Sequence, residues 1–285
     1  MNTKNLSKML FSRMIGGLGN QLFQIAACLK YKKLEEKVII SFLGDIHIPK
    51  RENCLEYIFE KPRWLYYDDS KNLNSFTRFC ARNSAYLRFG SYLPIVSIND
   101  RNFNFSDSRN FLKKTLFLDG YFNLNWTYSS LNHAFKKLKL RQIELGEEYL
   151  KSCREDVIIH IRGGDFLNIP KFNICKIDYY KNSIRYFISK GYRSFKVISE
   201  DQKYSKELIH KLKKIFIDIQ ITKLKTVSIK NDFNIIRSSR LAILSNSTFS
   251  WWASFLSNSK KEFVVPYHFS LQEKRMLLPN EIIVN

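Results

Sequence analysis

Short apolar runs alternate with amphipathic stretches along the second half of the chain. The runs are three to seven residues long and rich in β-branched residues, which is typical of buried strands. The stretches between them repeat apolar residues at helical spacing, and Gly191 follows the first of them as a helix-terminating glycine. The predicted strands are residues 157–161, 195–198, 215–221, 241–244 and 263–265, and we expect the strand at 263–265 to be the last. The predicted helices are residues 178–190, 204–214 and 249–256, together with a short helix that begins at Asp232.

The first half opens with the same alternation. Residues 8–15 predict a strand, residues 16–20 a glycine turn, and residues 21–33 a helix. A strand at 38–43 completes a strand–helix–strand unit, which favours a parallel sheet. We also expect helices within the Tyr-, Phe- and Arg-rich residues 44–114, a strand at 115–118 and a basic helix at 131–140.

This order of elements predicts an α/β protein with doubly wound parallel sheets. We place a domain boundary near residue 145, which gives domains 1–145 and 146–285. The composition, 45% hydrophobic and 26% charged over 285 residues, is that of an ordinary globular protein. No apolar run reaches the roughly 18 residues of a membrane-spanning helix, and the N-terminus lacks the apolar core of a signal peptide, so we expect a cytoplasmic protein.

The cysteines predict free thiols. Their number is odd, and they form neither a Cys-x-x-Cys pair nor a Cys/His metal spacing. We therefore expect a reducing compartment, with no structural zinc and no disulfide. The five are Cys28, Cys54, Cys80, Cys153 and Cys175.

The net charge of +21 is the unusual part of the composition. Such a charge attracts polyanions, phosphorylated small molecules or an anionic membrane surface, although many of the lysines can equally be solubilising surface residues. Nucleic acid is not favoured, because the basic residues are scattered and no helix-turn-helix, zinc-finger or RNP-type motif is present.

The glycine turn is the first candidate ligand site. Gly17 and Gly19 fit the start of a dinucleotide fingerprint, but Leu22 stands where the third glycine belongs. A nicotinamide-dependent enzyme is therefore not favoured, and no Walker loop is present. A turn without a ligand remains the alternative interpretation of these glycines.

The second candidate site follows the strand at 157–161. His160 and Arg162 point to the same side of that strand, at the end where open α/β sheets bind ligands. A guanidinium there can bind a phosphate in a bidentate manner. The alternative interpretation is an arginine paired with a nearby carboxylate, such as Asp165.

A hydroxyl-rich segment, residues 245–252, follows the strand at 241–244. It suits either a helix cap over a tryptophan core or an anion site at a helix N-terminus. Two phosphate-compatible strand ends in one sheet suggest a diphosphate ligand. Because the chain contains no Asp-x-Asp pair to hold a divalent metal, we expect a metal-independent reaction in which an arginine and a helix dipole offset the diphosphate charge.

Together, these motifs resemble glycosyltransferase family 11, the α-1,2-fucosyltransferases. The resemblance runs from Ile15 to about Pro266, and the last of its motifs is highly specific. The matching segments are residues 16–24, residues 120–122 with Asn123 where the family has Gln, residues 199–201, residues 232–233 and residues 245–252.

The resemblance implies a GT-B fold, in which two Rossmann-like domains face a cleft. The first would be the acceptor-side domain and the second the GDP-sugar donor-binding domain. It implies inverting, metal-independent transfer of L-fucose from GDP-β-L-fucose to the 2-hydroxyl of a galactoside or lipid-linked oligosaccharide, in O-antigen or surface polysaccharide synthesis. The enzyme would then contact the anionic cytoplasmic face of the inner membrane peripherally.

By motif position, the resemblance also implies site roles. Arg162 would hold the diphosphate, His160 would lie near the nucleotide, and Asp232 would contact the guanine. For the general base, which the resemblance does not assign, Asp165 is our first candidate, ahead of Glu200 and Asp201. The other implied donor-binding residues are Glu200, Asp201, Asn246, Ser247, Thr248 and Ser250, and the implied cleft-lining residues are Gly17, Gly19, Asn20 and Gln21.

One position departs from the family. The family pattern is His-x-Arg-Arg-x-Asp, and Gly163 replaces its second arginine. The donor is therefore open to GDP-colitose or another GDP-6-deoxyhexose. A non-catalytic relative that binds GDP-sugars or glycans is the alternative of a different class.

Overall fold

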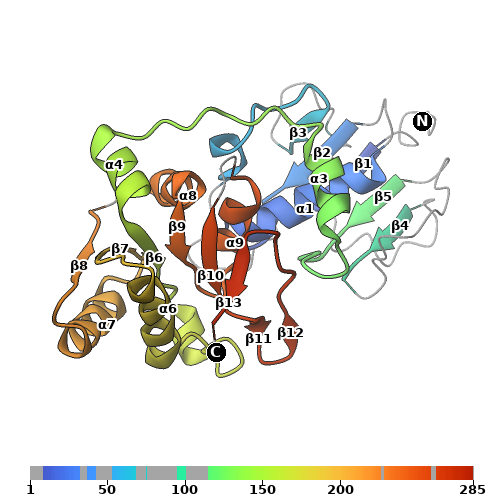
Figure 1. Ribbon diagram of the computed structural model, residues 1–285. Coiled ribbons are helices and arrows are strands. Elements are labelled where there is room, and N and C mark those ends of the chain that lie inside the picture. The colour runs from blue at the N-terminus through green and yellow to red at the C-terminus, as the bar shows by residue number, and fades with distance from the viewer. Residues whose placement is uncertain are drawn as a thin grey trace. The chain divides into compact units, whose positions relative to one another are not determined.

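Two compact units, residues 1–141 and 142–285, make up the computed structural model of the chain (Figure 1). The sequence placed this boundary near residue 145. The residues that the structure describes are 9–32, 37–42, 53–68, 75, 95–100, 115–225, 228–257 and 261–284.

The first unit contains a five-stranded parallel sheet with the order β3-β2-β1-β5-β4. Its core is apolar because β1 and β5 place Phe11 and Phe117 together, with their rings stacked 5.9 Å apart beside Ile39. The strands are β1 (Met9–Arg13), β2 (Lys37–Ser41), β3 (Leu65–Tyr67), β4 (Ile95–Ile98) and β5 (Thr115–Leu118), and the helices are α1 (Leu18–Tyr31), the 3-10 helix η2 (Leu55–Tyr57) and α3 (Tyr128–Phe135).

One prediction for this unit was wrong in part, and another was wrong in its bounds. We expected helices within residues 44–114, and the described part of them contains the 3-10 helix η2 and the helical residue Ser75 but also the strands β3 and β4, while Cys80 and residues 76–89 lie outside the described residues. The basic helix starts at Tyr128, where Thr127 and Ser130 form a capping box, and it ends at Phe135. It does not reach Leu140, because Leu140 pairs with Phe59 in an antiparallel bridge.

The second unit contains a six-stranded parallel sheet with the order β13-β10-β9-β6-β7-β8. Its helices fall into two contacting groups, α6 with α7 and α4 with α8 and α9, as expected for a doubly wound sheet. The strands are β6 (Val157–His160), β7 (Ser194–Ile198), β8 (Gln220–Lys223), β9 (Leu241–Ile243), β10 (Glu262–Val265) and β13 (Glu281–Ile283), with a hairpin of β11 (His268–Ser270) and β12 (Glu273–Lys274); the helices are α4 (Glu147–Glu155), α5 (Asp165–Asn168), α6 (Ile177–Ser189), α7 (Gln202–Ile215), α8 (Ile229–Ser238) and α9 (Thr248–Phe255).

The core of the second unit explains why its strands were easy to predict. The side chains of Ile159, Val197 and Ile243 pack with Ile184 of α6 and Leu212 of α7 in one buried cluster. Central parallel strands are covered on both faces and therefore appear as continuous apolar runs. Gly191, which has φ +91°, ends the α6 segment as predicted.

Three details of the second unit differ from the prediction. β10 is not the last strand, because β13 pairs with it in parallel beyond the β11–β12 hairpin. Residues 215–219 are not a strand, since α7 continues to Ile215 and β8 begins at Gln220. α8 begins at Ile229 rather than Asp232, because Ser228 caps it by accepting from the Asn231 N–H.

Two further predictions concern free thiols and the lack of a membrane-spanning helix. Cys28, Cys54, Cys153 and Cys175 are free and buried, which confirms the prediction for the cysteines that the structure describes. Burial raises the pKa of Cys28 and of Cys175 to about 12. Over the described part of the chain, no helix has both the length and the apolar character needed to cross a membrane.

Candidate active site

The site lies at the carboxyl ends of β6, β7 and β9 in the second unit. The chain adds strands outward from β6 through β7 to β8, and then in the opposite direction through β9 and β10 to β13. β6 and β9 therefore flank the switch point, where open α/β sheets bind ligands. His160 ends β6, and Ser245 follows β9.

These two residues contact each other across the switch point. The Ser245 hydroxyl lies 2.9 Å from Nδ1 of His160, and both side chains are buried. The His160 ring also packs against Phe249 of α9, with the ring centroids 5.7 Å apart. Two of the predicted motifs, 160–165 and 245–252, are thus joined by a direct hydrogen bond.

Burial lowers the pKa of His160 to about 3, with the nearby Arg162 charge as the second cause. The imidazole is therefore neutral at physiological pH. A neutral ring suits a packing or hydrogen-bonding role next to a ligand. It does not supply positive charge to a diphosphate.

This shift predicts a pH dependence of stability. Between pH 3 and 6.5 the unfolded chain binds one more proton at His160 than the folded chain, so stability rises with pH across that window and falls on acidification. In His160→Gln we expect the slope of the unfolding free energy against pH to decrease by about 1.4 kcal/mol per pH unit.

Urea unfolding at several pH values between 4 and 6.5 measures this slope. His210→Gln, at an exposed position on α7, is the matched control and should retain the slope of the unaltered chain. An unchanged slope in His160→Gln would contradict a buried neutral His160.

Arg162 projects just beyond β6 and is surrounded by acceptors. Nη2 lies 2.5 Å from the Asp165 carboxylate, Nη1 contacts the Glu200 carboxylate, and the guanidinium lies over the Phe166 ring at 4.7 Å. The arginine side chain is largely buried, whereas both carboxylates are half-exposed. The carboxylate pairing weighed in the sequence is therefore present, and it brings Arg162, Asp165 and Glu200 together.

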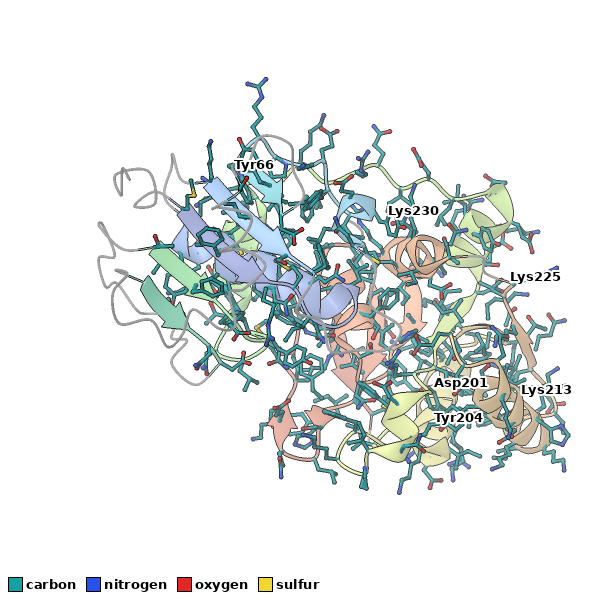
Figure 2. The ribbon with its side chains drawn as sticks, turned by 180° about the vertical axis from the view of Figure 1, so that it is seen from behind. Tyr66, Asp201, Tyr204, Lys213, Lys225 and Lys230 are labelled. Atoms are coloured by element: carbon teal, nitrogen blue, oxygen red, sulfur yellow. The ribbon has the colours of Figure 1, made fainter. Side chains whose placement is uncertain are left out.

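The Asp201 carboxylate accepts hydrogen bonds from two backbone N–H groups. One carboxylate oxygen accepts from the Gly164 N–H at 2.8 Å, and the other caps α7 by accepting from the Tyr204 N–H at 2.9 Å. Figure 2 shows Asp201 and Tyr204 next to each other at this end of the unit. These hydrogen bonds lower the pKa of Asp201, that from Gly164 being the largest cause, so its carboxylate is a weaker base than an ordinary aspartate.

Gly163, where the family has arginine, is tightly packed against the same aspartate. A Cβ at position 163 would lie 2.6 Å from both the Cβ and Oδ2 of Asp201. Real Cβ atoms do not approach other atoms so closely. The glycine thus allows Asp201 to bind the Gly164 N–H and hold the turn that follows β6.

We expect Gly163→Ala to lower the free energy of unfolding by about 1–3 kcal/mol, because Asp201 must move and its two hydrogen bonds are strained. Gly146→Ala is the control for steric contact, since its new Cβ would meet only Tyr149, at an ordinary 3.8 Å, and its loss should be limited to that of replacing the glycine N-cap of α4. Equal unfolding free energies for the two variants in urea would show that Asp201 moves freely.

Some residues of the hydroxyl-rich segment cap α9, and others form hydrogen bonds that hold neighbouring parts of the chain. Ser247 caps α9 by accepting from the Phe249 N–H at 3.3 Å, and half-buried Thr248 opens the helix. Ser250 is fully buried and donates to the Ser247 carbonyl at 3.1 Å. Asn246 donates from Nδ2 to the carbonyls of Phe172 and Phe269, each at 2.8 Å, so it ties two loops to the end of β9.

Asp232 lies in the first turn of α8 and is half-buried. Its charge acts on Lys223, whose Nζ donates to Gln202 and Ser205 at 2.7 and 2.5 Å. Burial lowers the pKa of Lys223, and the charges of Asp201 and Asp232 oppose that shift.

In the first unit, the glycine turn and residues 120–122 meet at the switch point between β1 and β5. The buried Gln24 side chain donates to the carbonyls of Ile15 and Gly120, at 3.2 and 3.1 Å. Gln21, which we expected to line the cleft, is fully buried (0% exposed) and donates to the Gly16 carbonyl at 3.1 Å. Gly19 is buried as well.

The other two predicted cleft-lining residues reach the surface. Gly17 is exposed, and Asn20 is half-buried at the start of α1. The backbone N–H groups of both Asn20 and Gln21 donate to the Gly17 carbonyl, at 2.9 and 3.1 Å.

The sequence analysis missed two residues that contact the motifs, Asp100 in the first unit and Phe166 in the second. Asp100, just beyond β4, accepts from the Tyr121 and Phe122 amides at 3.0 and 2.6 Å, and a Cβ on Gly120 would lie 2.8 Å from its carboxylate. Phe166 provides the ring over which Arg162 lies. Asp100 lies two residues after β4, a strand that the sequence did not predict, so no signal marked it, and none marked Phe166.

The described residues offer no group of three or more His, Cys, Asp or Glu side chains that could hold a metal ion. Metal independence of the reaction stays a prediction.

Comparison with known proteins identifies the family. The model of glycosyl transferase family 11 matches residues 90–280, which is 191 of the 285 residues. The chain belongs to glycosyl transferase family 11. The predicted resemblance is therefore confirmed, and the protein is a glycosyltransferase.

Two relatives of this glycosyltransferase come from Escherichia coli. An alpha-1,2-colitosyltransferase is 30% identical over 111 residues, which are 37% of this chain and 38% of the relative. The O-antigen biosynthesis glycosyltransferase WbnK is 24% identical over 294 residues, covering 90% of this chain and 93% of WbnK. The chain thus matches less than half of the colitosyltransferase but nearly all of WbnK.

Solved structures establish the fold. The fucosyltransferase NodZ from Bradyrhizobium aligns with a TM-score of 0.51 at 13% identity, covering 88% of this chain and 92% of NodZ. POFUT1 in complex with GDP aligns with a TM-score of 0.54 at 13% identity, covering 90% and 97%. The glycosyltransferase therefore has the predicted GT-B fold, with two Rossmann-like units.

Proposed function

We propose that this family 11 member is an inverting, metal-independent α-1,2-fucosyltransferase that moves L-fucose from GDP-β-L-fucose to the 2-hydroxyl of a galactoside. The observation that carries the proposal is the cluster of Arg162, the His160–Ser245 pair and the α9 N-terminus at one switch point. A guanidinium and a helix N-terminus are two groups that stabilise the charge of a departing diphosphate.

The proposed reaction is a direct displacement. The acceptor oxygen forms a bond to the anomeric carbon, and the bond from that carbon to the β-phosphate oxygen breaks. GDP leaves with the electron pair, and the hydroxyl proton passes to a general base. Arg162 would exchange one of its carboxylate partners for the diphosphate, while Ser247 and Thr248 at the start of α9 would bind phosphate oxygens.

Asp165 remains our first candidate for the base, followed by Glu200. Both carboxylates are half-exposed and therefore accessible to an acceptor. Asp201 is the least suitable of the three, because both of its oxygens accept backbone N–H groups and its pKa is lowered. We assign Asp201 to positioning the turn that carries Arg162.

GDP-colitose is the second candidate donor. It is supported by the alpha-1,2-colitosyltransferase relative and by Gly163, which departs from the family pattern next to the proposed donor site. The relative WbnK, an O-antigen biosynthesis glycosyltransferase, supports a role in O-antigen synthesis. We further propose a lipid-linked oligosaccharide at the cytoplasmic face of the inner membrane as the natural acceptor.

Acceptor-dependent GDP release tests the proposal. The full chain is incubated in EDTA with GDP-β-L-fucose, or in parallel with GDP-colitose, across a panel of galactosides, with acceptor-free samples as controls. We expect release only when a galactoside is present. The linkage in the product is then read by NMR.

Other outcomes would change the assignment. Release from GDP-colitose alone would select the second donor. GDP binding by calorimetry without release from either donor would favour the non-catalytic alternative. A failure to bind GDP would overturn the assignment of the donor site.

A further inference from the structure

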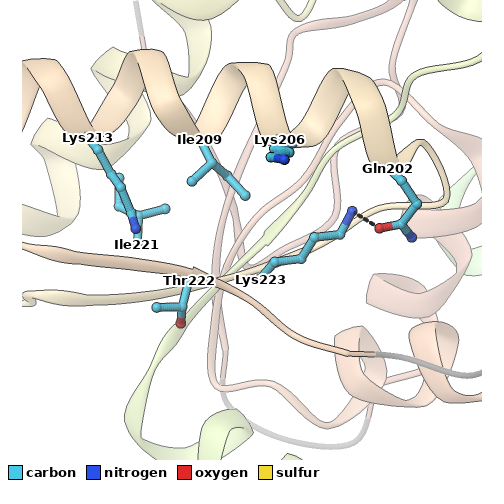
Figure 3. A pocket seen from close by; sticks show the side chains of 7 residues that line it. All are labelled: Gln202, Lys206, Ile209, Lys213, Ile221, Thr222 and Lys223. Carbon is cyan, nitrogen blue, oxygen red and sulfur yellow. Dashed lines mark hydrogen bonds between the residues drawn. The ribbon is translucent and has the colours of Figure 1, made fainter.

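A basic groove of about 390 Å³ runs between α7 and β8, at the outer edge of the sheet in the second unit. Its apolar floor contains Ile209 and Ile221, and Figure 3 shows both near Lys213. The side chains that line it are Gln202, Lys206, Ile209, Lys213, Ile221, Thr222 and Lys223.

An apolar tip continues this groove where α7 ends and the chain turns toward β8. Ile217 is 83% exposed and Ile215 is 43% exposed, directly after Lys213 and Lys214. Lys213 belongs to both the groove and the tip. We name the groove and this tip together the α7–β8 edge.

The charge of this edge is not neutralised locally. Residues 202–225 contain seven lysines but only two acidic residues, Glu207 and Asp218. Among the described residues, none of Lys206, Lys213 and Lys214 forms an ion pair. Figure 2 shows Lys213 and Lys225 along one margin of the unit.

We propose that the α7–β8 edge docks the enzyme on an anionic lipid bilayer. Exposed isoleucines between lysines fit such a surface, because the isoleucines enter the boundary of the acyl chains while the ammonium groups meet anionic headgroups. A soluble polyanion would use the lysines but would gain little from Ile217.

The place of this edge in the fold leaves the candidate active site accessible. α7 starts at Asp201, beside that site, and its 14 residues carry the tip about 21 Å away at the other end of the helix. The inference deepens the proposed function, since a lipid-linked acceptor lies at such a surface. Vesicle binding needs no donor, so docking and transfer can fail independently.

Vesicle flotation of the full chain tests the proposal. Vesicles of phosphatidylcholine with phosphatidylglycerol are compared with phosphatidylcholine alone, at low and high salt. We expect binding to the anionic vesicles only, weakened by salt. K206Q/K213Q/K214Q should bind about 100-fold more weakly, at about fivefold for each lysine, and I217S about tenfold more weakly.

Matched variants separate the edge from the overall charge. K136Q/K137Q/K151Q removes three exposed lysines elsewhere, and L271S removes an isoleucine-sized side chain that is 67% exposed on the β11–β12 hairpin. Both should bind like the unaltered chain. Equal losses in the test and control variants would overturn the proposal, as would binding that ignores salt. So would tight binding of a short DNA duplex through the same lysines without any vesicle binding.

Discussion

Replacing Arg162 with alanine is expected to lower kcat/KM for acceptor-dependent GDP release by about 10²–10³-fold. In the structure the guanidinium binds Asp165 and Glu200, so its removal deletes a positive charge and leaves two neighbouring carboxylates. Both changes oppose a diphosphate leaving group. Arg162→Lys should recover only part of the loss, because an ammonium cannot contact both partners in the geometry of the guanidinium.

Arg185→Ala is the matched control for this variant. It removes the same charge from an exposed position on α6, where Arg185 contacts only Asn182 among the polar groups described, at 3.4 Å. Its turnover should equal that of the unaltered chain. Near-normal turnover in Arg162→Ala, with the fold intact by urea unfolding, would exclude Arg162 from donor binding.

Glu281→Ala is expected to cause the largest loss of stability, about 3–5 kcal/mol in the free energy of unfolding. Glu281 pairs with Arg275, and both side chains are fully buried (0% exposed). Glu281 also accepts from the Leu278 N–H at 3.0 Å, which fixes the entry into β13. Without the carboxylate, the Arg275 guanidinium stays buried with its charge uncompensated. Urea unfolding followed by tryptophan fluorescence measures the loss.

Two further variants test the physical reason. Lys190→Ala breaks the exposed ion pair with Glu262, which should cost no more than about 1 kcal/mol. Arg275→Met combined with Glu281→Leu replaces the whole buried pair by apolar groups and should recover most of the stability of the unaltered chain. A small loss in Glu281→Ala would mean that water reaches Arg275.

Local signals were enough for most of the second unit. Its central strands are apolar on both faces, so their runs appear without ambiguity, and Gly191 marks the end of the α6 segment by its positive φ. Predicting that motifs 160–165 and 245–252 share one edge needed only the rule that parallel strands end together. β13 escaped because it is three residues long and is held by a side-chain pair, Arg275 with Glu281, that no periodic pattern marks.

The polar side chains were harder to predict, because their partners come from distant parts of the chain. Gln21 has the residue type of a cleft-lining group, yet its amide also binds the Cys54 N–H at 3.2 Å, 33 residues away. The Gln21 side chain is therefore buried, and its hydrogen bonds join the glycine turn to Cys54. Asn246 is similar, because the carbonyls that it binds belong to residues 74 and 23 positions away.

The sequence by itself determined the α/β class, the family and the strand ends that carry polar motifs, because periodicity and short motifs are local properties. Only the tertiary structure decided the partners of Arg162, the contact of Gly163 with Asp201 and the burial of Gln21. Each of these depends on which groups from separate segments compete for the same space and the same hydrogen bonds. That competition is settled when the sheets and loops pack, so no single segment encodes its result.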